Sequence, residues 1–220
     1  MMLSRGATAL VRRLAIFLLL LCAVSAFAGT DATAWQCEGT QGGVVISSRT
    51  PTGSSVKEFR GVGEIEASSS VVFAVLNDPE AFPSFMPYVA EIKVLQRTKD
   101  STVAYQRLSM PLISDRDYTV RSEHSETQGP DGPVYHIHWN SANALGPAPL
   151  PGVERVQSCA GSWLLEATGP GATRATYLIQ SDTGGAIPAF MANHGSQVAI
   201  RKVFAAVRKE VLEPKYAASK

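Results

Sequence analysis

The sequence of 220 residues lacks both the charge pattern of a nucleic-acid-binding protein and the long apolar run of a membrane-spanning helix. Lysine and arginine number 20 and aspartate and glutamate 19, whereas nucleic-acid binding depends on a dense basic surface. The longest strongly apolar run, Leu14–Val24, is far shorter than the roughly 20 residues that cross a bilayer. The composition, 45% hydrophobic and 18% charged, is that of one globular domain. We therefore expect a small molecule, a lipid or a protein as partner, and no nucleic acid.

Motifs for catalysis and metal binding are also missing. The sequence has no Gly-x-Ser-x-Gly nucleophile elbow, no glycine-rich phosphate-binding loop and no paired-cysteine metal motif. His136 and His138 project from one face of an expected strand, and such a pair can begin a zinc site. A third ligand at suitable spacing is absent, which favours exposed polar strand residues as the interpretation. We expect no catalytic residue, no metal and no cofactor.

The N-terminus has the three parts of a secretory signal peptide. Three arginines at positions 5, 12 and 13 precede the apolar run, and Ala26-Phe27-Ala28 forms a small-x-small cleavage site. Cleavage after Ala28 would leave 17 basic and 19 acidic residues in a secreted or periplasmic protein. An uncleaved anchor is the alternative. The expected organisation is a signal peptide over 1–28, a short tail over 29–34, one domain over 35–213 and a C-terminal tail over 214–220.

Export would leave two cysteines, Cys37 and Cys159, in an oxidising compartment, because Cys22 lies within the signal peptide. A disulfide between them would close a long loop, which the chain-entropy model values at about 4 kcal/mol. The alternative is a pair of buried free thiols, because the sequence does not give the Cα separation that a disulfide requires.

Apolar and β-branched runs separated by turn residues predict nine strands. Ser68-Ser69-Ser70 predicts the start of a helix that runs through Leu76, and Glu80–Phe85 is typical of a second short helical turn. The pattern predicts a large curved antiparallel sheet with a small helical insert. The expected strands are Trp35–Glu38, Val44–Thr50, Val56–Ala67, Val89–Gln96, Thr102–Met110, Arg116–Glu123, Val134–Asn140, Val153–Thr168 and Thr173–Asp182.

The period of the apolar residues changes near the C-terminus, where Ile187–Leu212 is predicted as one long amphipathic helix. Apolar residues recur at helical spacing from Ile200 to Val211, and basic residues fall on the opposite side. Upstream, the same stripe passes through Asn193 and Gln197. A helix packed on an ordinary core has little need of such polar groups, so we expect the N-terminal half of this helix to face a cavity.

Several short strings follow one another in a characteristic order along residues 35–213. They are Trp35 with Gly43-Val44, Ser48-Arg49, Phe59-Arg60-Gly61, the stretch Val71–Leu95, Asp115-Arg116-Asp117-Tyr118 with Arg121, Gly161-Ser162-Trp163, and Gly184-Gly185 with Ile187-Pro188. In this order they resemble the START domain (steroidogenic acute regulatory protein-related lipid transfer) of bacterial type, within the wider Bet v 1-like, helix-grip superfamily. The resemblance implies an α+β helix-grip fold, in which a curved antiparallel sheet of about nine strands wraps a long C-terminal helix around an internal hydrophobic tunnel.

The resemblance also implies where a ligand binds. An arginine at the position of Arg121 can point into the family's tunnel, and Asp117 and Thr119 share its strand face. A buried arginine needs a polar partner, so we expect Arg121 to donate to a ligand oxygen, with an ion pair to Asp117 or another acid as the alternative. Some members of the family place an acid on the preceding strand as the partner of this arginine. The matching stretch here is Tyr105-Gln106-Arg107-Leu108, which contains no acid. The other expected lining residues are Trp139, Trp163, Tyr177, Phe190, Asn193 and Gln197.

The segment Met110-Pro111-Leu112-Ile113, which joins two expected strands, is too apolar for a plain turn. In the family this loop borders the C-terminal helix, so we expect Met110, Leu112 and Ile113 to form a gate and to touch the membrane. A loop folded onto the core is the alternative.

The function implied by the resemblance is that of a monomeric carrier. Such a carrier binds a single lipid or sterol-like molecule and makes transient contact with membrane surfaces to exchange it. Two alternatives remain: an enzyme of the same superfold, such as a cyclase or hydrolase, and a ligand-gated sensor or scaffold. The missing catalytic motifs argue against the enzyme.

Overall fold

A computed structural model describes residues 33–54, 56–182 and 189–219 of the chain, without the side chains of residues 189–193 and 218–219. These residues belong to one unit, Ala32–Lys220. The expected signal peptide, the Gly184-Gly185 pair and the side chains of Phe190 and Asn193 lie outside the described residues. In the described ranges no helix combines the length and apolar character needed to cross a bilayer.

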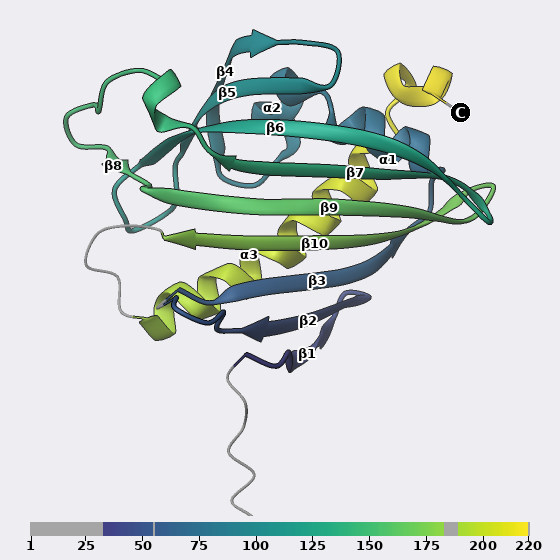
Figure 1. The fold of residues 1–220 in the computed structure, drawn as a ribbon, viewed down its shortest axis with the longest axis horizontal. Helices are drawn as coiled ribbons and strands as arrows, with labels where there is room; N and C mark the ends of the chain where they lie inside the picture. Colours follow the sequence, from purple (N-terminus) through teal and green to yellow (C-terminus); the bar gives the residue numbers. More distant parts are fainter. Residues whose placement is uncertain (1–32, 55, 183–188, 220) are drawn as a thin grey trace, which may run out of the picture. The chain divides into compact units, whose positions relative to one another are not determined.

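Nine antiparallel strands of the described chain form one sheet in the order β1-β2-β3-β10-β9-β7-β6-β5-β4, and the short β8 joins β6 in parallel (Figure 1). The expected α+β architecture is confirmed. The strands are β1 (Gln36–Gln41), β2 (Val44–Arg49), β3 (Glu58–Ile65), β4 (Val89–Arg97), β5 (Ser101–Leu108), β6 (Arg116–Gly129), β7 (Gly132–Ser141), β8 (Glu154–Arg155), β9 (Ser158–Gly169) and β10 (Ala172–Asp182). The helices are α1 (Ser69–Leu76), α2 (Phe82–Phe85) and α3 (Ala189–Glu210), with 3-10 turns η1 (Pro79–Ala81), η2 (Asn143–Leu145) and η3 (Pro214–Ser219).

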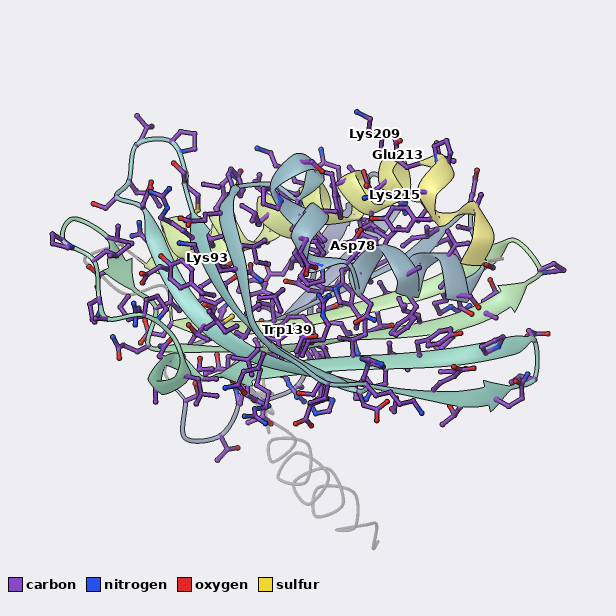
Figure 2. All side chains as sticks on the ribbon, turned by 90° about the horizontal axis from the view of Figure 1, so that it is seen from above. Asp78, Lys93, Trp139, Lys209, Glu213 and Lys215 are labelled. Atoms are coloured by element: carbon purple, nitrogen blue, oxygen red, sulfur yellow. The ribbon has the colours of Figure 1, made fainter. Side chains whose placement is uncertain are left out.

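The three α-helices lie on one face of the sheet, which we call the inner face, and the opposite face is the outer face (Figures 1 and 2). Residues paired across strands share a face, because side chains alternate along each strand. Trp163 of β9 pairs with Ile137 of β7 and Tyr177 of β10. The ring centroid of Trp163 lies 5.3 Å from that of Phe204 on α3. Because α3 lies on the inner face, this contact places the Trp163 side chain there, and the side chains of its paired residues lie on the same face.

The C-terminal half of α3 packs directly on β3, where two glycines leave room for it. A Cβ atom on Gly61 would lie 2.6 Å from Cγ2 of Ile200 and 3.1 Å from Cε2 of Phe204, so a side chain there would push the helix away. Ile200, Phe204 and Val207 are fully buried at this contact. Arg208 holds the end of the helix, because its guanidinium donates to carbonyl oxygens of the β1–β2 turn and of β3.

Helix α1 covers the inner face beside the C-terminal half of α3, and the two helices share one buried cluster (Figure 1). It begins as the sequence predicts, because the side chain of Ser68 accepts a hydrogen bond from the amide of Val71. Val72 and Val75 are completely buried, and the Phe73 ring stacks on Tyr135 of β7 with 4.4 Å between centroids. The two helices therefore close the same part of the inner face together.

Residues 142–157, which we call the outer strap, run along β6 and cover part of its outer face. The side chain of Asn143 accepts a hydrogen bond from the amide of Thr119 at 2.8 Å and donates to the carbonyl of Val156 at 2.8 Å. Because β8 pairs with β6 while β9 pairs with β7 and β10, the chain changes partners between Arg155 and Ser158. The prediction of one continuous strand over Val153–Thr168 is therefore wrong.

The two cysteines of the domain are both free thiols. Cys37 is exposed on β1 and Cys159 is buried on β9, and β2, β3 and β10 lie between their strands. Neighbouring strands are about 4.8 Å apart, so this separation is far beyond the reach of a disulfide. The predicted disulfide is wrong, and of the two thiols only Cys159 fits the alternative of a buried one.

Candidate functional site

Three side chains, Tyr118, Trp139 and Tyr177, form a surface on the inner face that we call the aromatic wall. The Trp139 ring stacks on Tyr177 with 5.9 Å between centroids, and Trp163 lies 4.5 Å from Tyr177. Tyr118 and Trp139 both pack on the buried cluster of Val120, Val156 and Cys159. The wall thus extends across β6, β7, β9 and β10.

The aromatic wall is only partly buried, although Trp139 lies near the middle of the sheet (Figure 2). Trp163, by contrast, is 4% exposed because Phe204 covers it. The difference follows from the helix above: the C-terminal half of α3 closes on the sheet, and the wall lies beyond that contact. An apolar, aromatic surface that the protein leaves partly uncovered is a candidate for contact with a hydrophobic ligand.

A few polar atoms interrupt this apolar surface. The hydroxyl of Tyr118 donates to Oε1 of Gln106 on β5 at 3.2 Å. In the described part of the chain, the amide nitrogen of Gln106 and the hydroxyl of Tyr177 have no hydrogen-bond partner. Apolar walls with a small number of placed polar groups are typical of sites that orient a small molecule.

The titratable groups of the wall stay uncharged at neutral pH. Burial raises the pKa of Tyr118 well above its ordinary value, and nearby Cys159 and Tyr177 raise it further. Burial also raises the pKa of Tyr177. Burial raises the pKa of Cys159 to about 11. Hydrogen bonds with Trp139 and Ser181 lower this pKa, but the effect of burial is larger. The wall therefore presents phenols and a protonated thiol, which is a poor nucleophile.

Of the predicted lining residues, Trp139, Trp163 and Tyr177 lie on the inner face, as expected. Contact with a ligand stays a prediction for all three. Trp163 is the least accessible, because Phe204 covers it. The other two form the partly exposed wall.

The predicted tunnel position of Arg121, Asp117 and Thr119 is wrong, because these residues lie on the outer face. Arg121 is exposed, whereas Asp117 and Thr119 are fully buried beneath the outer strap. The proposed ion pair of Arg121 with Asp117 is also wrong, since Asp117 pairs with Arg155. The alternation of the strand explains the error: Tyr118 and Val120, which gain most from burial, take the inner face.

Gln197 does not line the wall. Its amide donates to a carboxylate oxygen of Glu38 on β1 at 3.2 Å, and Ser48 and Lys57 contact the same carboxylate. This contact fastens the N-terminal half of α3 to the edge of the sheet. The side chains of Phe190 and Asn193 lie outside the described residues, so their expected positions stay predictions.

The predicted gate segment forms the connection between β5 and β6. Leu112 is 103% exposed and has a φ of 69°, a left-handed conformation that is unusual for leucine. Met110 and Ile113 are partly buried. Part of the loop thus rests on the domain while Leu112 projects fully into solvent. The role of the three residues as a gate stays a prediction.

His136 and His138 lie on the outer face with ring centroids 5.6 Å apart, and Nε2 of His138 lies 3.2 Å from a carboxylate oxygen of Glu123. Burial and the neighbouring His138 lower the pKa of His136. Over the described ranges, no three histidine, cysteine, aspartate or glutamate side chains form a group that could hold a metal ion.

Two surface hollows are lined by described residues. One, of about 440 Å³, lies between α2 and the end of α3, near Lys209, Glu213 and Lys215 (Figure 2). The other, of about 480 Å³, lies on the outer face near His136 and His138. The charged lining of the first hollow suits water better than an apolar ligand, whereas the lining of the second includes Trp139 and Leu178.

Sequence reasoning missed Tyr118 of the wall and Gln106, which accepts a hydrogen bond from the Tyr118 hydroxyl. The resemblance pointed to Arg121 and so selected the wrong face of β6. The signal that could have found Tyr118 is the alternation itself, because Tyr118 and Val120 are apolar while Asp117, Thr119 and Arg121 are polar. Gln106 follows from Tyr118 through the β5–β6 register, which the sequence does not supply.

Several solved structures share this fold. A START-related lipid transfer protein (fragment 25–204) from Xanthomonas axonopodis is 26% identical, with a TM-score of 0.71 over 81% of this chain and 99% of that chain. Human STARD10 is 22% identical, with a TM-score of 0.72 over 82% of this chain and 74% of that chain, and shows the fold alone. The Zhui aromatase/cyclase from Streptomyces is 14% identical, with a TM-score of 0.54 over 74% of this chain and 98% of that chain.

Sequence comparison identifies relatives as well. An uncharacterized protein of Pseudomonas aeruginosa, PA1579, is 28% identical over 160 residues, which cover 72% of this chain and 77% of that protein. The family model described as polyketide cyclase / dehydrase and lipid transport matches residues 65–208, from the end of β3 to the end of α3. The aromatic wall and the helix that faces it fall within this match, and the chain belongs to this family, with the helix-grip fold of START domains.

Proposed function

We propose that this protein binds one hydrophobic, lipid-like molecule between the aromatic wall and the N-terminal half of α3, and exchanges it with membranes. The observation that carries the proposal is the partial exposure of Tyr118, Trp139 and Tyr177 on the inner face, beyond the point where Phe204 covers Trp163. Aromatic side chains left uncovered in such a place lose the burial free energy that a bound apolar molecule would supply.

The physical benefit of such a carrier is large. A lipid chain that crosses water without a carrier exposes apolar surface worth about 0.8 kcal/mol per methylene group, so a chain of about sixteen carbons meets a barrier above 10 kcal/mol. A protein that encloses the chain removes most of this barrier. No covalent step is required.

The similarity to the Xanthomonas protein, which is described as a lipid transfer protein, supports a carrier. An enzyme acting in the same space is the alternative, because the family also includes cyclases. The protonated state of Cys159 argues against it as a nucleophile at neutral pH. We therefore favour the carrier.

Exchange with a membrane requires part of the enclosure to open. The β5–β6 loop is the cheapest element to move, because Pro111 and Leu112 are exposed and bury little apolar area. Leu112 and Ile113 would offset part of the opening cost by entering the apolar part of a bilayer. We assign Met110, Leu112 and Ile113 this gating role.

The same proposal includes export of the carrier. Arg5, Arg12 and Arg13, the apolar run and Ala26-Phe27-Ala28 motivate cleavage after Ala28, which would place the protein in the periplasm or outside the cell. N-terminal sequencing of the protein purified from its own cells tests this step. A mature chain that begins at Met1 or Met2 would refute it.

Native mass spectrometry of the protein purified from its own cell envelope tests binding. We expect a mass increment that corresponds to one lipid and disappears under denaturing conditions. Trp139→Ala should reduce the occupied fraction strongly. Trp35→Ala is the matched control, because the Trp35 ring contacts the guanidinium groups of Arg49 and Arg60 and is not part of the wall. Absence of any lipid from the wild-type protein, or equal losses in both variants, would contradict the proposal.

A further inference from the structure

Residues 144–153 of the outer strap form an exposed apolar segment, which we call the strap tip. Its sequence contains no aspartate, glutamate, lysine, arginine or histidine and no aromatic residue. Leu145 and Leu150 are 43% and 44% exposed, and every residue from Pro147 to Gly152 is exposed. An exposed stretch without any charge is unusual on a protein surface and indicates contact with an apolar partner.

The strap tip is fixed to the beginning of β6. The guanidinium of Arg155 donates to the carbonyl of Pro147 at 3.1 Å while it pairs with Asp117. On the other side of the tip, the amide of Glu154 donates at 2.8 Å to the carbonyl of Asp115, which ends the β5–β6 loop. The strap tip and the β5–β6 loop therefore leave the domain side by side, next to β8 (Figure 1).

The strap tip has few backbone donors. Pro147, Pro149 and Pro151 have no amide hydrogen, and the amide of Val153 donates to the carbonyl of Leu150 at 3.2 Å. An amide hydrogen that leaves water without finding a partner is unfavourable in an apolar medium. Because proline reduces the number of such groups, the strap tip enters the boundary between headgroups and acyl chains at a lower cost than an ordinary loop.

A protein partner is less well matched to this segment. Protein interfaces form about one hydrogen bond per 100–200 Å² and depend on aromatic and arginine side chains as anchors. The strap tip contains no such side chain. Leu112 of the neighbouring β5–β6 loop is 103% exposed, so both segments present apolar side chains at the same end of β6. A lipid bilayer is the partner that can contact the two segments together.

We propose, on the basis of the proposed function, that the strap tip is a fixed membrane-contact element that inserts Leu150 and the prolines beside it among the lipid headgroups of a bilayer. In this arrangement the β5–β6 loop moves, whereas the ion pair of Arg155 with Asp117 holds the strap tip in place. The strap tip thereby orients the gate toward the bilayer. Because it carries no charge, the contact depends on apolar insertion and not on anionic lipid.

A fluorescent label tests the insertion directly. Ala148→Cys places nitrobenzoxadiazole in the strap tip, and Thr127→Cys places it near the far end of β6 as the control. Both are made in a chain with Cys22→Ser and Cys37→Ser, so that the buried Cys159 is the only other thiol. On addition of phosphatidylcholine vesicles, the emission of the label at position 148 should rise at least about twofold and shift to the blue, because the label leaves water. The label at position 127 should not respond.

Charged side chains in the strap tip should weaken binding to vesicles. Ala148→Asp combined with Leu150→Asp should lower partition to phosphatidylcholine vesicles at least about tenfold. Thr127→Asp combined with Gln128→Asp is the matched control, because it adds the same charge to the exposed end of the β6–β7 hairpin. Higher salt, or addition of phosphatidylglycerol, should change partition of the wild type by less than about twofold. Circular dichroism verifies folding, and the label at position 148 carries the test if the strap variant does not fold.

The outcomes separate this proposal from the proposed function. In native mass spectrometry the strap variant should retain the lipid of the wild type, because no residue of the strap tip belongs to the aromatic wall. Binding that requires phosphatidylglycerol and does not respond to the strap variant would overturn the proposal and leave lipid carriage intact, as would a wild type that binds no vesicles. A label at position 148 that responds without vesicles, in a protein that sediments as a dimer, would also overturn it, because a second copy would then cover the strap tip. Absence of lipid from the wild type would overturn the proposed function itself.

Discussion

Arg155 and Asp117 form a two-point ion pair on the outer face of the sheet, with Nε 2.6 Å from Oδ1 and Nη2 3.1 Å from Oδ2. Asp117 is fully buried, and the side chain of Arg155 is 11% exposed. The hydroxyl of Tyr105 donates to the same carboxylate at 3.2 Å. The ion pair attaches the outer strap to β6, on the face of the strand opposite to Tyr118.

Replacement of Arg155 should therefore destabilise the protein strongly. Arg155→Ala leaves the Asp117 carboxylate buried without its cation, which costs about 3–5 kcal/mol. Urea unfolding measures the loss. Arg121→Ala, on the exposed part of the same strand face, should change the stability by no more than about 0.5 kcal/mol. Similar losses in the two variants would contradict the structural role assigned to the pair.

The close approach of α3 to β3 predicts that Gly61 does not tolerate a side chain. A Cβ atom at this position would lie 2.6 Å from Ile200, so Gly61→Ala should cost about 1–3 kcal/mol through overpacking. Gly171→Ala is the matched control, because a Cβ atom there meets no atom within 4 Å. Thermal unfolding of both variants measures the difference. An unchanged melting temperature for Gly61→Ala would show that the helix packs farther from β3.

The two free thiols should react very differently. Because burial raises the pKa of Cys159 to about 11, only roughly one thiol in a thousand is ionised at a pH of about 8. Iodoacetamide labelling followed by peptide mass spectrometry should modify the exposed Cys37 and leave Cys159 unmodified. Labelling of Cys159 should begin as the pH approaches 11, or when the protein unfolds. Equal labelling of both thiols at a pH of about 8 would be evidence against a closed packing around Cys159.

The β5–β6 loop should govern transfer more than binding. Leu112→Asp combined with Ile113→Asp should slow lipid transfer between vesicles several-fold, because charged side chains do not enter the apolar part of a bilayer. Equilibrium binding of a soluble ligand analogue should stay close to that of the wild type. The control is Leu212→Asp, a 75% exposed leucine beyond the end of α3. A normal transfer rate in the double variant would place the gate elsewhere.

Sequence patterns predicted elements well where local chemistry determines them. Ser68 caps α1, and the apolar stripe of α3 begins its contact with the sheet at Ile200, as expected. The β6–β7 hairpin was predicted too short, because Ser125–Gln128 is polar and has no core to cover. Those residues extend β6 only through backbone pairing with β7. The pattern of apolar residues does not reveal such an extension.

The candidate site depended on which face of β6 turns inward, and here the alternation of side chains was a better guide than the resemblance. Trp139 and Tyr177 were placed correctly because each belongs to an apolar alternation. Arg155 could not be found as the partner of Asp117, because the contact requires the strap to cross the strand. The contact of Gln197 with Glu38 likewise joins opposite ends of the chain.

The pairing of β3 with β10 has a consequence for the time course of folding. It places Gly61 opposite Tyr177, so the N-terminal hairpin stays without its neighbouring strand until almost the whole domain has been synthesised. Sheets built on such distant pairings fold slowly, because the loop must close before the pairing stabilises it. A chain that folds late remains unfolded for longer after synthesis begins, which suits the export that we propose.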